Sequence, residues 1–114
     1  MSRDPALYLE DMETACSKIL RYIAGMTLSD LIRDDRTYDA VVRNLEIIGE
    51  AVKNVPMEIK NQYPQVEWRA IGALRNIVAH EYFGVKDEII WDILENKSPV
   101  LRTQVQLILH EMGN

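Results

Sequence analysis

Residues 35 to 56 read DRTYDAVVRNLEIIGEAVKNVP, and this stretch decides the class of fold. Its apolar residues recur at steps of three and four, as at Leu45, Ile48 and Val52, which is the spacing of one face of an α-helix. Pro56 cannot continue a helix and closes it. A helix with a single apolar face must bury that face against other elements. The stretch therefore predicts a long amphipathic helix in the core of the protein.

The rest of the chain repeats this periodicity, and no segment alternates long enough to predict a strand. Asp4 and Pro5 are typical of a helix start, and Gly25 is typical of the residue just past a helix end. Further helices are predicted over residues 57–63, 67–82, 88–95 and 98–109, with Gly84 ending the second of these and with Asp87 and Ser98 as N-caps of the last two. We therefore expect an all-α, up-and-down bundle of four to five helices with short connecting helices.

The length of 114 residues predicts one domain spanning residues 1–114. The net charge is −5, but residues 41–80 carry five basic and four acidic groups, whereas the flanking segments are acidic. An acidic chain argues against broad nonspecific nucleic-acid binding, yet it leaves room for a local basic cleft. The single cysteine, Cys16, is expected to be a small core residue in a reducing compartment.

The first residues do not resemble a signal peptide, because Glu10, Asp11 and Glu13 interrupt any apolar stretch. No uncharged apolar run approaches the roughly 20 residues that span a bilayer. We expect a cytoplasmic protein without a membrane partner.

Residues 75 to 82 read RNIVAHEY, and they are the one candidate active site in the sequence. We call these eight residues the octet. Arg75 can bind phosphate oxygens, His80 can exchange a proton near neutral pH, and Tyr82 offers a hydroxyl. On a regular helix Tyr82 lies almost above Arg75, while Asn76 and His80 share a neighbouring stripe. Asn76 could then hydrogen-bond one nitrogen of the His80 ring and fix its tautomer.

The chemistry that suits Arg75 and His80 without a metal is RNA cleavage by the neighbouring 2′-hydroxyl, with His80 as general acid or base and Arg75 stabilising charge at phosphorus. These two residues are roughly 140° apart on a helix. They converge only if the helix end is distorted or a second surface wraps round them. A two-fold interface would bring two octets together, so we expect a homodimer.

Simpler interpretations of the same residues exist. The helix macrodipole alone favours Arg75 and His80 near a helix C-terminus, and Tyr82 could be a core aromatic.

Glu46 and Glu50 are expected to form a solvated edge or to pair with Arg43 and Lys53. The sequence has no cysteine pair for zinc and no glycine-rich phosphate loop, so no metal or cofactor is expected.

The octet resembles the Arg-x4-His-x-Tyr signature of the HepT-like ribonuclease toxins, in the HEPN superfamily. The resemblance extends from about Leu7 to Leu109. Residues 39–51, DAVVRNLEIIGEA, look like the long second helix of that family, and the pairs Tyr63-Pro64 and Trp68-Arg69 look like its lead into the catalytic helix. The stretches 82–85 (YFGV) and 89–91 (IIW) match the segment that follows.

This resemblance implies a homodimeric bundle and a metal-independent endoribonuclease that acts on RNA as the toxin of a toxin-antitoxin pair. Its catalytic residues would be Arg75 and His80, with Asn76 as the polar residue after the arginine. Tyr82 would be the tyrosine to which a cognate minimal nucleotidyltransferase antitoxin transfers AMP. The alternative is a noncatalytic, nucleotide-binding or adaptor subunit of a nucleotidyltransferase complex, in which Tyr82 matters and His80 does not.

Overall fold

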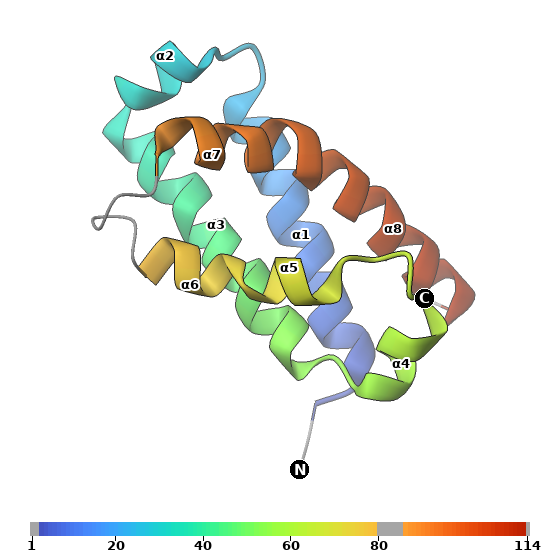
Figure 1. The fold of residues 1–114 in the computed structure, drawn as a ribbon. Coiled ribbons are helices and arrows are strands. Elements are labelled where there is room, and N and C mark those ends of the chain that lie inside the picture. The colour runs from blue at the N-terminus through green and yellow to red at the C-terminus, as the bar shows by residue number, and fades with distance from the viewer. Residues whose placement is uncertain (1–2, 80–85, 114) are drawn as a thin grey trace.

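Helices make up all the regular structure in the computed structural model, which describes residues 3–79 and 86–113. The predicted all-α class is therefore confirmed (Figure 1). Three long helices form the frame: α1 (Pro5–Ile23), α3 (Asp35–Asn54) and α8 (Ser98–Glu111). The shorter elements are α2 (Leu28–Ile32), α4 (Met57–Gln62), α5 (Trp68–Gly72), α6 (Leu74–Ala79), α7 (Asp87–Asp92) and the π-helical turn η2 (Ile93–Lys97).

The ends of α1 and α3 form as the sequence predicts. The Asp4 carboxylate accepts a hydrogen bond from the Ala6 N–H at 3.0 Å, and Pro5 is the first helical residue. Gly25 follows the end of α1 with a φ of 77°, a conformation that costs glycine little. Asp34 caps α3 by accepting from the Thr37 N–H at 3.1 Å. These local signals are sufficient to fix where both helices start.

The core lies where α1 packs antiparallel against α3 and alongside α8 (Figure 1). Leu9, Ile19, Ile48 and Ile108 are among its fully buried side chains, within one contiguous cluster. Cys16 belongs to this cluster, as predicted, and burial raises the pKa of its thiol to about 12. That residues 1–114 are one domain stays a prediction.

The predicted continuous helix over residues 67–82 is wrong. Its described part is broken at Ala73 into α5 and α6, which both pack across α3 (Figure 1). The Ala73 N–H still donates to the Arg69 carbonyl at 3.1 Å, whereas the Asn76 N–H turns back to the Ala73 carbonyl at 3.0 Å. The hydrogen-bond step therefore changes from four residues to three at the junction of α5 and α6. Apolar spacing alone does not reveal such a break.

The two predicted helices over 88–95 and 98–109 form one uninterrupted helical run through α7, η2 and α8. Ser98 is not an N-cap, because its hydroxyl donates to the Ile93 carbonyl at 3.3 Å inside the π-helical turn. Asp87 is not an N-cap either, since Lys86 occupies that position. The Asp87 carboxylate instead accepts from the Tyr38 hydroxyl at 2.6 Å. This bond ties the first turn of α7 to the first turns of α3.

Candidate active site

The first two residues of the octet, Arg75 and Asn76, lie in α6, and both are exposed. His80 and Tyr82 lie outside the described residues. The predicted proximity of Asn76 to His80, and of Arg75 to Tyr82, therefore stays a prediction.

The position of Arg75 depends on a glycine of α3. A Cβ atom built on Gly49 would lie only 2.8 Å from the backbone nitrogen of Arg75. Contacts this short do not occur at real Cβ atoms, and a backbone nitrogen cannot move aside alone. Gly49 therefore allows α6 to cross α3 at close range, with the crossing point at Arg75 itself.

The residue after Gly49 sets the electrostatics of this crossing. Nε of Arg75 lies 3.1 Å from Oε2 of Glu50, while the side chains remain 44% and 54% exposed. An exposed ion pair contributes little to stability, so its main effect is on orientation. Because Glu50 pairs with Nε and no other described residue pairs with Arg75, nothing in the described part of the chain occupies its two terminal amino groups, which suit a phosphate.

Both glutamates of α3 lie on an exposed edge, as predicted, but only one of them has the predicted partner. Glu46 pairs with Arg43 at 3.2 Å, as predicted. Glu50 pairs with Arg75 on another helix, instead of with Lys53. Spacing within α3 could not reveal this partner, because Arg75 lies 25 positions after Glu50 and on another helix. A glycine inside an apolar helix face was the one available signal of a close helix crossing.

Arg75 and Asn76 open onto a surface hollow of about 350 Å³, whose remaining walls come from α3, α4 and α5. The candidate site is thus an exposed guanidinium at the edge of a concave surface. Among the described residues, no group of three or more histidine, cysteine or acidic side chains is placed to hold a metal ion.

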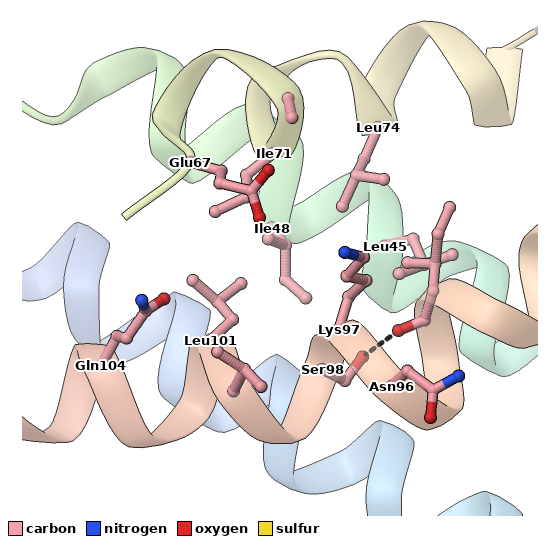
Figure 2. A pocket seen from close by; sticks show the side chains of 13 residues that line it. Leu45, Ile48, Glu67, Ile71, Leu74, Asn96, Lys97, Ser98, Leu101 and Gln104 are labelled. Atoms are coloured by element: carbon pink, nitrogen blue, oxygen red, sulfur yellow. Dashed lines mark hydrogen bonds between the residues drawn. The ribbon is translucent and has the colours of Figure 1, made fainter. Parts of the chain in front are cut away.

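A second hollow, of about 300 Å³, lies between α3, α5, α6 and the start of α8, and Figure 2 shows its lining. Leu45 and Ile48 face it from α3, and Leu101 faces it from α8. Its ionisable groups are Glu67 and Lys97. A mostly apolar hollow without a histidine or an arginine is poorly suited to phosphate chemistry, so the edge of α6 is the better candidate.

Comparison with known proteins decides the family. A family model described as "Ribonuclease HepT-like" matches residues 12–108, which include α6 and the complete octet. The chain belongs to the HepT-like ribonuclease family. The predicted resemblance to this family is thereby confirmed, while the roles of the octet residues stay predictions.

Relatives of this HepT-like chain match it over nearly its whole length. A protein of Methanocaldococcus jannaschii, provisionally named an RNase, is 39% identical over 110 residues, which is 96% of this chain and 91% of the relative. Another provisionally named RNase, from Caldanaerobacter subterraneus, is 38% identical over 96% of this chain and 97% of its own length. A protein of Thermococcus cleftensis named "Probable ribonuclease HepT" is 36% identical, with 90% and 93% covered.

No solved structure gives a significant match to this HepT-like chain. In the described ranges, 3–79 and 86–113, none of the helices is long and apolar enough to cross a bilayer.

Proposed function

We propose that this protein is a metal-independent endoribonuclease that acts as the toxin of a toxin-antitoxin pair. The observation that carries the proposal is the exposed guanidinium of Arg75, whose one partner among the described residues is Glu50, at Nε, in a chain of the HepT-like ribonuclease family. A guanidinium whose terminal amino groups can turn to a ligand suits a phosphate in which charge builds up.

In the proposed reaction, the 2′-oxygen of one nucleotide attacks the adjacent phosphorus, and the bond from phosphorus to the 5′-oxygen breaks. His80 accepts the proton of the 2′-hydroxyl, and a second acid gives a proton to the departing 5′-oxygen. The products are a 2′,3′-cyclic phosphate and a 5′-hydroxyl. Arg75 stabilises the extra negative charge on the phosphorane oxygens, and Asn76 holds the tautomer of His80.

A homodimer would supply the second acid as the His80 of the other copy. The reason to expect a site built from both copies is the angle of roughly 140° between positions 75 and 80 on a regular helix, which keeps the two side chains of one copy apart. Sedimentation of the RNA-free protein at micromolar concentration measures its mass. A dimer is the expected result, and a strict monomer would rule out the composite site.

Inactivation by a partner completes the proposal. A minimal nucleotidyltransferase antitoxin would transfer AMP to the hydroxyl of Tyr82. The added phosphate would be a natural partner for Arg75 and would compete with RNA for the guanidinium.

The experiment that tests the cleavage reaction compares Arg75→Ala and His80→Ala with the wild type on a single-stranded RNA, with and without a chelator. Each substitution is expected to lower the cleavage rate about 100- to 10,000-fold, and the chelator should leave the wild-type rate unchanged. The matched controls are Arg21→Ala and His110→Ala, because both side chains are exposed on helices away from α6.

Wild-type cleavage by the His80→Ala protein would contradict the mechanism, and loss of wild-type cleavage in chelator would contradict its independence of metal. If purified wild type does not cleave RNA but is modified at Tyr82, the noncatalytic adaptor is the better interpretation.

A further inference from the structure

The hollow beside Arg75 is lined by positive side chains from several helices. Lys53 comes from α3, Lys60 from α4 and Arg69 from α5, and they line it together with Arg75 and Asn76. We call this surface the basic hollow. Among the described residues that line it there is no carboxylate, and Glu50 reaches it only as the partner of Arg75, whereas each of the three other hollows described in this chain is lined by at least one.

The charge of the basic hollow stands out because the chain as a whole has a net charge of −5. Residues 41–80 hold five basic side chains, and four of them line this one hollow. Four consecutive helices, α3 to α6, therefore bring four of the five positive charges of this segment to one concave surface.

Lys53, Lys60 and Arg69 form ion pairs with none of the described carboxylates. Elsewhere in the described chain, Arg3, Arg33, Arg43 and Arg102 have a carboxylate partner, and cations without one, such as Lys18, Arg21 and Arg36, line none of the hollows described here. Gathering cations without such partners costs the folded chain electrostatic energy. A polyanion that binds across them would relieve this repulsion.

We propose that the basic hollow binds the phosphates of single-stranded RNA that adjoin the cleaved one, through Lys53, Lys60 and Arg69. This inference rests on the proposed function, since Arg75 at the rim of the hollow would hold the reacting phosphate. In Figure 1, α6, α5 and α4 follow one another along the molecule, so the RNA backbone would run from the edge of α6 toward α4.

A single strand fits this surface better than a duplex. The volume of about 350 Å³ is at the small end of ligand sites and suits one or two nucleotides. The half-buried Trp68 also lines the hollow, where its Nε1–H donates to the Tyr63 carbonyl at 2.9 Å. A ring held in this way offers a stacking surface to an unpaired base. Attack by a 2′-hydroxyl in line with the departing oxygen also requires a backbone that can leave the geometry of a duplex.

The test measures RNA binding by the full chain carrying His80→Ala, so that the RNA stays intact. Fluorescence anisotropy of a labelled single-stranded oligonucleotide gives the Kd across a series of salt concentrations. The triple variant Lys53→Gln, Lys60→Gln, Arg69→Gln is expected to bind at least 10-fold more weakly at low salt. Its slope of log K against log salt should be smaller by about two, because each lost contact with a single strand removes about 0.7.

The matched control removes three exposed cations from other surfaces, with Lys18→Gln, Arg21→Gln and Arg36→Gln. It changes the net charge by the same amount and should keep both the affinity and the slope. Arg69→Gln alone gives a smaller change in the same direction and serves if the triple variant unfolds.

Equal losses in the triple variant and in the control would overturn the inference, because they would show general attraction instead of a site. Equal affinity for the same sequence as a duplex would overturn the choice of a single strand. The binding readout does not depend on cleavage, so an inactive wild type would contradict the proposed function alone.

Discussion

Nε of Arg75 lies 3.1 Å from Oε2 of Glu50, and this contact joins α6 to α3 at the candidate site. The ion pair engages the guanidinium at Nε. No other described residue pairs with Arg75, so within the described chain its two terminal amino groups are available for RNA. The neighbouring Gly49 lets the backbones approach closely enough for the pair to form. Two consecutive residues of α3 therefore set the position and the orientation of the proposed phosphate-binding group.

Glu50→Gln tests whether the carboxylate positions Arg75. The variant should lose about 10- to 100-fold in kcat, because a guanidinium free to turn is seldom aligned with the phosphorus. KM should stay constant or fall, since a negative charge beside the RNA is removed. Stability should change by less than about 1 kcal/mol, as for other exposed ion pairs.

Steady-state kinetics on a defined RNA separates these effects, and the control is Glu46→Gln, which breaks the ion pair with Arg43 on the same helix. An unchanged kcat in Glu50→Gln, or an equal loss in both variants, would remove the positioning role.

Gly49→Ala tests the close crossing of α3 and α6. A methyl group 2.8 Å from the Arg75 nitrogen must push α6 away, which should cost about 1–3 kcal/mol of unfolding free energy and lower cleavage as well. Gly72→Ala is the control, because its Cβ would meet only the Val52 side chain at 3.6 Å, an ordinary contact. Urea unfolding of both variants measures the difference. Equal stability of the two alanine variants would show that the crossing tolerates a methyl group.

Tyr82→Phe tests the proposed modification site. When the wild type is produced together with its cognate nucleotidyltransferase, mass spectrometry should show one added AMP on Tyr82. The phenylalanine variant lacks the acceptor oxygen, so it should gain no AMP and should stay toxic in the presence of the partner. Modification that survives this substitution would place the acceptor elsewhere.

Asp34→Asn tests the pH dependence of the cap on α3. The hydrogen bond from the Thr37 N–H, followed by the one from the Thr37 hydroxyl, lowers the pKa of Asp34 below its usual value of 3.8. A carboxylate with a lowered pKa in the folded state stabilises the protein above its unfolded pKa, and this contribution is lost as the pH falls through the folded pKa. The stability advantage of the wild type over Asp34→Asn, which retains a capping oxygen, should therefore shrink from pH 6 to pH 2. Urea unfolding at several pH values measures it, and a constant difference would contradict the ionic contribution.

Local signals in the sequence were enough to predict the class of fold and the positions of the long helices α1 and α3. The apolar steps of residues 35–56, the Asp4-Pro5 start and the Gly25 end depend on contacts within a few residues, and the structure confirms all three. The family was also visible in the sequence, because the order of residue types along the chain suggests it without any knowledge of the fold, and the family model confirms it over residues 12–108.

Only the tertiary structure decided which elements meet. Periodicity states which face of a helix is buried, but not what covers it or at what angle. It therefore missed the break at Ala73, the π-helical turn that joins α7 to α8 just before Ser98, and the choice of Arg75 as the partner of Glu50.

The basic hollow has the same origin. Lys53, Lys60 and Arg69 lie on three helices, and only the fold, in which α3, α4 and α5 line one hollow, brings their charges together. The sequence determined that residues 41–80 carry slightly more basic than acidic groups in an otherwise acidic chain, while the crossing of α6 over α3 at Gly49 decided that this charge lies beside Arg75.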